Sequence, residues 1–317
     1  VIKGVADSQA TQQAAEWRAS RTASARGTLT AEARASQTAE ARASQTAQAI
    51  AAASSSTPSP LPPSLTPTPS PLPLSLGVGT TQISPVDGMV LSYIPAGTFQ
   101  MGSDPGFSDM QPVHSVTLDA FWMDQTEVTN GMYALCVADG DCSPPERTIS
   151  YTRDSYYGNP TYANYPAIYV DWHQAEAYCT WAGRQLPTEA QWEYAARGGL
   201  AGATYPWGEG VDCTQANYWT GDACVGDTSA VGSYAANGYG LDDMAGNVWE
   251  WVADWYDADY YSRSPAENPE GPASGNNRVL RGGAWYLDDI YLVVSIRDQR
   301  DPGVTFDFIG FRCLLLP

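Results

Sequence analysis

The distribution of apolar side chains divides the chain into two unlike parts. Residues 1–80 contain few large apolar side chains, whereas residues 86–317 hold nearly all of the Trp, Tyr and Phe. Only a segment that can bury enough apolar surface offsets the conformational entropy lost on folding. We therefore predict one folded domain at 86–317, preceded by a tail that has no core of its own.

Three helices are predicted in the folded part, from the helical spacing of apolar residues and from residues that commonly begin helices. The first begins at Thr129, and the second runs from Asp171 to a stop at Gly183. The third begins at Thr188, where Gln191 has the spacing of a capping box, in which each side chain accepts a hydrogen bond from the other residue's backbone N–H.

Strands are predicted near the start of the folded part. Met89–Phe99 has the pattern of a strand interrupted at Pro95–Gly97, and Val116–Met123 predicts another strand. After Ala196 the sequence is dominated by Gly, Asn, Asp and aromatic residues, which favours short strands joined by long turns. The expected fold class is therefore α+β with little regular secondary structure.

The tail has two compositions. Residues 1–53 are rich in Ala and contain the repeat TAEARASQ at Thr30–Gln37 and Thr38–Gln45, which predicts a spacer that is helical or disordered. Residues 54–85 form a linker rich in Ser, Thr and Pro, which favours an extended chain. We interpret both segments as a spacer that displays the folded domain, not as a site.

The folded part is strongly acidic. The whole chain has a net charge of −19, and residues 81–317 carry ten Lys and Arg against thirty-one Asp and Glu. Such a surface repels phosphate backbones and anionic lipid, so we expect no nucleic acid partner and no direct membrane contact. No apolar run is long enough to span a membrane, and any anchor or export signal is expected upstream of residue 1.

Six cysteines lie in the folded part. Cys136 and Cys142 are close in sequence, as are Cys213 and Cys224, and both pairs bracket turn residues, so each is interpreted as a local disulfide. No pair has the spacing of a zinc site with matching His ligands. This cysteine usage predicts an oxidising compartment, and hence an extracytoplasmic or cell-surface location.

Six blocks of sequence in the folded part are highly specific. They are Ile94–Gly102 (IPAGTFQMG), Glu127–Asn130 (EVTN), Trp181–Gly198 (WAGRQLPTEAQWEYAARG), Gly238–Trp251 (GYGLDDMAGNVWEW), Arg278–Trp285 (RVLRGGAW) and Ile309–Cys313 (IGFRC). In content and order they closely resemble the formylglycine-generating enzyme, or sulfatase-modifying factor, family over about residues 86–317. The resemblance implies a C-type-lectin-like fold stapled by disulfides, one of which joins Cys179 to Cys313.

The charged residues in these blocks are expected to have structural roles. Arg197 and Arg281 are interpreted as buried partners of Glu189, Glu193 or Glu250. Pairs of this kind hold loops in place and perform no chemistry.

The resemblance also indicates where catalytic cysteines would stand. In the family two cysteines follow a Gly-Gly pair, and their thiolates suit a soft Cu(I) ion. The matching positions here are Leu287 and Leu292, which offer no lone pair, so we expect neither copper nor enzymatic activity. The related iron-dependent sulfoxide synthases need a cluster of His ligands, whereas this chain has only His114 and His173, in unrelated contexts.

Structural calcium is implied by the resemblance as well. Family members bind Ca²⁺ through oxygen ligands in two loops. The matching residues are Asn217 and Asp222 in one loop, and Gly246, Val248 and Glu250 in the other. For Glu250 the alternative is a salt bridge to an arginine.

The segment from Tyr286 to Phe308 departs from the family pattern in short patches. The residues expected to bind a ligand there are Tyr286, Leu287, Asp288, Asp289, Ile290, Tyr291, Ile296, Asp298, Val304, Phe306, Asp307 and Phe308. A subset of the family serves as the variable protein of diversity-generating retroelements, in which mutagenesis at adenines turns Asn codons into a restricted set of codons. Every residue of 286–296 and 304–308 belongs to that set.

These features favour a non-catalytic module that binds an unknown protein or surface ligand through a diversified surface. Two other functions stay open: a copper-dependent formylglycine-generating oxidase with displaced catalytic groups, and a degenerate structural member of the family. A structural alternative also exists for the segment itself, because Tyr291–Ile296 has the β-branched, apolar pattern of a buried strand.

Overall fold

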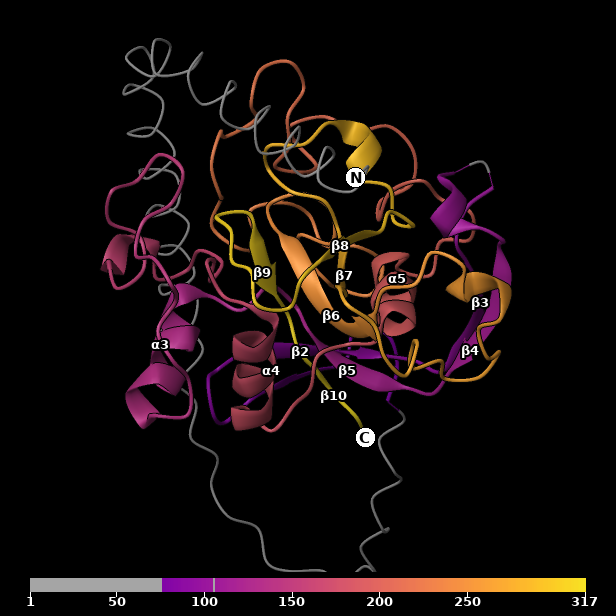
Figure 1. The fold of residues 1–317 in the computed structure, drawn as a ribbon, viewed down its shortest axis with the longest axis horizontal. Coiled ribbons are helices and arrows are strands. Elements are labelled where there is room, and N and C mark those ends of the chain that lie inside the picture. Colours follow the sequence, from indigo (N-terminus) through magenta and orange to yellow (C-terminus); the bar gives the residue numbers. More distant parts are fainter. Residues whose placement is uncertain (1–75, 105) are drawn as a thin grey trace, which may run out of the picture. The chain divides into compact units, whose positions relative to one another are not determined.

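The computed structural model describes residues 76–104 and 106–317 (Figure 1). The fold described below is that of the unit Leu72–Pro317, within these described residues. The predicted repeat spacer and most of the predicted linker lie outside the described residues.

A four-stranded antiparallel sheet joins the two ends of the domain. Its strands stand in the order β1 (Thr81–Ile83), β2 (Val90–Ile94), β5 (Phe121–Asp124) and β10 (Leu314–Leu315). Because β1 pairs with β2, the fold begins before residue 86, and the predicted start of the domain is too late. The hydrophobic pattern missed β1 because its only large apolar side chain, Ile83, is exposed.

A two-stranded hairpin formed by β3 (Gly97–Met101) and β4 (His114–Leu118) lies next along the chain. The predicted strand with a break at Pro95–Gly97 is confirmed, because β2 and β3 stand on either side of Pro95. The single strand predicted at Val116–Met123 is wrong, since β4 and β5 are separate strands in different sheets. All four residues of β5 are buried, so this strand lacks the alternating pattern that would have marked its start.

The second four-stranded sheet forms the centre of the domain. Its order is β8 (Asp298–Arg300), β7 (Arg278–Arg281), β6 (Trp249–Trp255) and β9 (Ile309–Phe311). The pair β6–β9 is parallel and the other pairs are antiparallel. Trp251 and Phe311 stand opposite each other in the parallel pair, and both are fully buried. The segment on which the ligand-binding prediction rests therefore connects β7, β8 and β9.

The three predicted helices are confirmed at their starts. They are α3 (Asn130–Asp139), α4 (Trp172–Trp181) and α5 (Glu189–Ala196). Thr129, Asp171 and Thr188 cap them through their side chains, and both α4 and α5 have a complete capping box. In Figure 1, α4 and α5 are seen on either side of β6 and β7. Each cap contributes about 1 kcal/mol of helix stability.

The rest of the described chain is turns and single-turn 3-10 helices, which agrees with the predicted α+β class of low regular structure. The 3-10 helices are η1 (Ser108–Met110), η2 (Pro160–Tyr162), η3 (Tyr260–Ser262) and η4 (Asp289–Tyr291). The buried strand considered at Tyr291–Ile296 is not formed, because η4 and a turn occupy that segment. No helix in the described part is long and apolar enough to cross a membrane.

Three disulfides use all six cysteines of the chain. They join Cys136 to Cys142, Cys179 to Cys313, and Cys213 to Cys224. The expected pairings are thus formed. The Cys179–Cys313 bridge spans 134 residues and ties α4 to the last strands of the domain.

A buried ion network links α5 to the central sheet. Arg281 pairs with Glu193 at 2.5 Å and lies 3.5 Å from Glu189. Glu193 also pairs with Arg197, and Glu189 with Arg297, both at 2.6 Å. Burial alone would raise the pKa of Glu193, but Arg197 and Arg281 outweigh it and hold that pKa below its ordinary value. These contacts confirm the structural roles expected of Arg197 and Arg281.

Candidate functional site

Three aromatic side chains of the predicted binding segment form one half-buried patch. Tyr286 lies 4.5 Å from Phe308 between ring centroids, and Phe308 stacks on Phe306 at 4.9 Å. Trp285 is buried next to them, and its ring centroid lies 5.6 Å from that of Tyr286 in a T-shaped arrangement. The structure therefore brings together residues that are about twenty positions apart in sequence. We call Tyr286, Phe306 and Phe308 the aromatic patch.

The backbone behind the aromatic patch is held by the central sheet and the turn before it. The N–H of Trp285 donates to the carbonyl of Asn247 at 2.9 Å, and the N–H of Trp249 donates to the carbonyl of Phe308 at 2.8 Å. Asn247 has a φ of 59°, in the left-handed region. The two chain segments that carry the patch are thus hydrogen-bonded to the same motif, Gly246–Trp249 (GNVW), and the patch is preorganised.

The turn at η4 continues the surface with a different chemistry. Asp288, Asp289 and Ile290 are exposed, and Leu287 is half-buried. The carbonyl of Leu287 accepts a hydrogen bond from the N–H of Trp219 at 2.9 Å, so the loop closed by the Cys213–Cys224 disulfide supports this turn. We call Asp288–Ile290 the acidic turn.

A glycine fixes how the acidic turn returns to the core. Gly283 has a φ of 77°, and a Cβ there would lie 2.3 Å from the carbonyl oxygen of Tyr291 and 2.8 Å from Leu292. Only glycine permits this close approach. The two ends of the turn are therefore held close together.

Two residues predicted to bind a ligand do not face solvent. Ile296 is 2% exposed, and its carbonyl accepts a hydrogen bond from Arg281 at 2.6 Å. Asp307 is 4% exposed and lies in sequence between the half-buried Phe306 and Phe308. Both predictions are corrected, because the codon pattern on which they rested carries no information about burial.

The remaining predicted residues lie at the edge of the surface. Tyr291 and Val304 are half-buried and pack against the core. Asp298 is half-buried in β8, where burial raises its pKa against the effect of Arg300, whose Nη1 lies 2.8 Å away. The exposed part of the predicted site is therefore the acidic turn, with the aromatic patch half-exposed beside it.

The two leucines at the family's cysteine positions have ordinary packing roles. Leu292 is fully buried in a cluster with Tyr205 and Tyr218. Leu287 is half-buried and packs against the main core. The residues at these positions do not fit a copper ion, because neither side chain has a donor atom and all six cysteines of the chain are in disulfides.

The predicted calcium ligands do not form one site. The carboxylate of Glu250 accepts two hydrogen bonds from Arg312, at 2.7 and 2.8 Å, and one from Trp192 at 2.7 Å. Glu250 is therefore the partner of an arginine, as the alternative interpretation expected. Asn217 is fully buried, whereas Asp222 is exposed.

The other two predicted ligands, Gly246 and Val248, lie in the turn that packs on Asn217. A Cβ at Gly246 would stand 2.5 Å from the backbone oxygen of Asn217. This close packing accounts for the glycine without a metal ion.

A different pair of carboxylates has oxygens that no protein group satisfies. Oε2 of Glu127 and Oδ1 of Asp243 are buried and accept no hydrogen bond. Burial and then the charge of Asp243 raise the pKa of Glu127, and burial raises the pKa of Asp243 to about 6. Sequence reasoning missed this pair, although both residues lie in the specific blocks EVTN and LDDMAGN.

Oxygens of this kind suit a hard cation such as Ca²⁺. Within residues 76–104 and 106–317 no group of three His, Cys, Asp or Glu is arranged to hold a metal ion. A calcium ion at Glu127 and Asp243 would therefore need backbone carbonyls or water as its further ligands.

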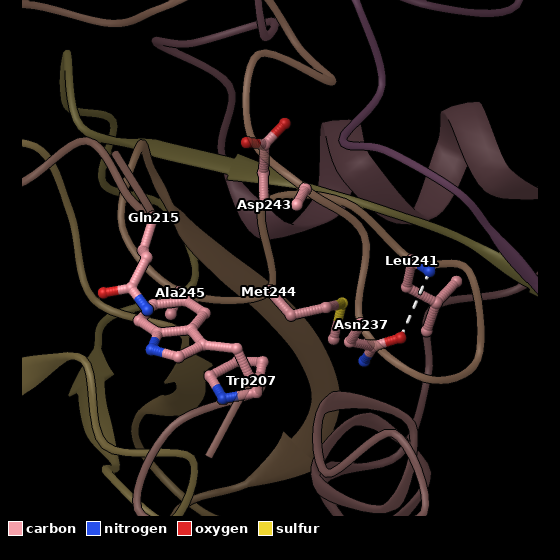
Figure 2. A pocket seen from close by; sticks show the side chains of 9 residues that line it. Trp207, Gln215, Asn237, Leu241, Asp243, Met244 and Ala245 are labelled. Atoms are coloured by element: carbon pink, nitrogen blue, oxygen red, sulfur yellow. Dashed lines mark hydrogen bonds between the residues drawn. The ribbon is translucent and has the colours of Figure 1, made fainter. Parts of the chain in front are cut away.

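A small cavity lies beside Asp243 (Figure 2). Trp207, Gln215 and Met244 are among the residues that line it, and the carboxylate of Asp243 points away from them. Its volume of about 10 Å³ is room for roughly one water molecule. This cavity is too small for an organic substrate.

The chain is similar to known proteins over the whole described domain. The profile of the Sulfatase-modifying factor enzyme 1-like domain matches residues 78–316. A serine/threonine-protein kinase pkn1 of Chlamydia caviae is 40% identical over 70% of this chain, but the match spans only 37% of that relative's length.

Two further similarities cover nearly all of the protein compared. The formylglycine-generating enzyme of Streptomyces coelicolor is 36% identical, over 69% of this chain and 87% of that enzyme. Among solved structures, Treponema denticola variable protein 1 superposes with a TM-score of 0.63 at 26% identity, over 75% of this chain and 99% of that one.

Proposed function

This chain belongs to the sulfatase-modifying factor enzyme 1-like family, and from that premise we propose that its domain is a non-catalytic binding module with a diversified surface. The observation that carries the proposal is the pairing of two features in one segment. Leucines stand at both positions where the family's cysteines would bind copper, and the same segment presents the aromatic patch and the acidic turn.

The residues argue against the oxidase reaction of the family. Thiolates hold a Cu(I) ion, whereas Leu287 and Leu292 have only carbon and hydrogen at those positions. The six cysteines are committed to three disulfides and leave no thiol to substitute. The 36% identity to a formylglycine-generating enzyme keeps that reaction as the alternative to be tested.

The aromatic patch has the properties of a protein-binding surface. Tyr and Phe supply a large contact area and lose little side-chain entropy on binding, as in antibody paratopes. The rings of the patch already pack against one another in the domain, so little ordering remains to oppose association.

Diversification is supported by where the permitted residues lie. The restricted codon set covers 286–296 and 304–308, and these two strips contain both the acidic turn and the aromatic patch. The likeness to a variable protein from Treponema denticola is consistent with such a role. The ligand would be a protein or a surface structure reached from an extracytoplasmic position, in keeping with three disulfides.

A structural calcium ion forms part of the proposal. Glu127 and Asp243 would hold it through their unpaired oxygens. Its charge would offset the repulsion between the two buried carboxylates and stabilise the GNVW turn on which the aromatic patch is built.

The function is tested with the full chain, loaded with copper under reducing conditions that spare its disulfides. A peptide with the sequence pattern Cys-x-Pro-x-Arg is the substrate, and aldehyde is detected by mass spectrometry and by hydrazide capture. The Streptomyces coelicolor enzyme serves as the positive control. We expect no aldehyde from this chain under conditions in which the control converts the peptide, and aldehyde formation would overturn the proposal.

A further inference from the structure

An apolar groove opens beside the acidic turn. It has a volume of about 400 Å³ and is lined by Ser103, Gly106, Phe107, Met110, Ile290 and Val293. One wall comes from the loop after β3 and the other from the predicted variable segment. Phe107 is 53% exposed and Ile290 is 52% exposed, so two large apolar side chains stand open to solvent at the same groove.

The two walls of the groove are fixed to the same frame. Met110 is buried, and its carbonyl accepts a hydrogen bond from the N–H of Ser103 at 3.1 Å, which closes the first loop. Arg297, which follows the variable segment, donates to the carbonyl of Asp109 at 2.7 Å. Because both walls rest on buried residues, the groove exists before any ligand arrives, which lowers the entropic cost of binding.

Exposed carboxylates adjoin the lining residues of this groove in sequence, on both walls. Asp288 and Asp289 are exposed on the acidic turn, next to Ile290, and Asp104 is exposed in the opposite loop. Burial, and then the charge of Asp289, raise the pKa of the nearby Tyr205. An apolar floor with several carboxylates at its rim is complementary to a ligand that joins an apolar group to positive charge.

The cations of the domain are directed inward. Residues 76–317 contain no Lys, and of their ten Arg only Arg147 and Arg263 are exposed. Arg263 is in turn paired with Asp257. The outer surface therefore presents carboxylates with few cations among them, and a cationic partner would meet little repulsion on approach.

We propose that this groove receives an apolar side chain from a cationic polypeptide segment, whose Lys or Arg residues contact Asp288, Asp289 and Asp104. The inference rests on the proposed binding function and narrows it to one class of partner. The loop wall, with Asp104, Phe107 and Met110, lies outside the variable segment and would be common to every variant of the surface. The side chains of the variable wall would then select among such segments.

The test is an unbiased selection of random peptides displayed on phage, carried out on the immobilised full chain. We expect the recovered peptides to combine Lys or Arg with a large apolar residue and to be released by raised salt. Ile290→Asp removes an apolar contact from the groove and is expected to weaken these peptides by about tenfold or more, because a buried apolar side chain contributes more to binding than one added exposed charge. The double variant Asp288→Asn/Asp289→Asn is expected to weaken them less and to remove most of the salt dependence.

Matched controls use the same changes elsewhere. Leu135 on α3 is 47% exposed, so Leu135→Asp repeats the apolar-to-acid change, and Asp141→Asn/Glu176→Gln repeats the loss of two charges. These variants are expected to bind the peptides as the parent does. Recovery of neutral or acidic peptides, recovery of none, or equal weakening by test and control variants would overturn the inference.

The outcome also separates this inference from the binding function on which it rests. Peptides that lose affinity with Phe308→Ala but keep it with Ile290→Asp would overturn the cationic groove and leave binding at the aromatic patch intact. Aldehyde formation by the copper-loaded chain would overturn the binding function itself.

Discussion

Replacement of Arg281 by Met tests how the fold holds the binding segment from inside. Arg281 is fully buried at the end of β7, and its guanidinium donates to three consecutive carbonyls of that segment. The distances are 2.9 Å to Val294, 3.0 Å to Ser295 and 2.6 Å to Ile296. Met fills part of the same volume but donates no hydrogen bond.

The expected loss of stability follows from these contacts. Breaking a buried ion pair by removing one partner costs about 3–5 kcal/mol. Glu193 keeps its contact with Arg197 at 2.6 Å, so the lower part of that range applies to the pair. Each carbonyl left without a donor adds about 1–3 kcal/mol unless water reaches it. We therefore expect Arg281→Met to lower the free energy of unfolding by about 5 kcal/mol.

Urea denaturation followed by tryptophan fluorescence measures this loss. Domains of this kind are stable by about 5–15 kcal/mol, so the midpoint should fall by a large fraction of its value. Arg263→Met is the matched control, because Arg263 is exposed and its removal is expected to change stability by less than about 1 kcal/mol. If the two variants had similar midpoints, the claim that Arg281 anchors the segment would be refuted.

Three further predictions concern the disulfides, a buried carboxyl group and the proposed calcium ion. Loss of the Cys179–Cys313 bridge is expected to lower the free energy of unfolding by about 5 kcal/mol, and loss of Cys136–Cys142 by about 2 kcal/mol, because the first bridge closes the longer loop. Thermal unfolding of the two double Cys→Ser variants measures the difference, and equal losses would contradict the prediction. Burial, and then the charge of Glu189, raise the pKa of Asp254 from an ordinary 3.8 to about 7. Protonation of Asp254 therefore stabilises the folded state fully below about pH 4, and this stabilisation is lost as the pH rises to 7. Asp254→Asn should remove that decline in stability, and an unchanged pH profile of unfolding would refute the prediction. Calcium at a hundredfold excess over its Kd should raise the free energy of unfolding of the parent by about 2.7 kcal/mol and that of Asp243→Asn by little. Equal melting temperatures of the parent with Ca²⁺ and with EGTA would count against the calcium site.

The helices could be predicted because their signals are local. Thr129, Asp171 and Thr188 each satisfy N–H groups within three residues, so the pattern is complete within a few positions. The central sheet was not predicted as a sheet. The parallel pairing of Trp249 with Ile309 joins positions sixty residues apart, and no local pattern encodes that contact.

The binding segment shows what the sequence alone could not resolve. Its apolar run at 291–296 fits a buried strand, yet Leu292 and Val294 pack into different clusters on either side of a turn. The pattern identified which residue types are present but not which of them face outward. Burial separated Tyr286 and Phe308 from Ile296 and thereby reduced the predicted surface to its exposed part.

The partners of the predicted calcium ligands could not be predicted from the sequence for a related reason. Glu250 matches a family position by sequence, but Arg312 and Trp192 occupy its carboxylate oxygens. Unpaired buried oxygens belong to Glu127 and Asp243, which are 116 positions apart in sequence, and also to Asn217, one of the predicted ligands. Which polar groups meet in the interior depends on the tertiary structure, and local sequence patterns do not reveal it.

The most direct test of a diversified binding surface is the DNA sequence that flanks the gene. The account predicts a near-copy of codons 278–313 beside a reverse transcriptase gene, differing from the coding copy only where the near-copy has adenine. The differences should fall on the codons for 286–291, 304–306 and 308, and should spare those for the buried residues Leu292, Val294, Ile296 and Asp307. A locus without such a copy, or with differences concentrated at the buried codons, would contradict the central claim.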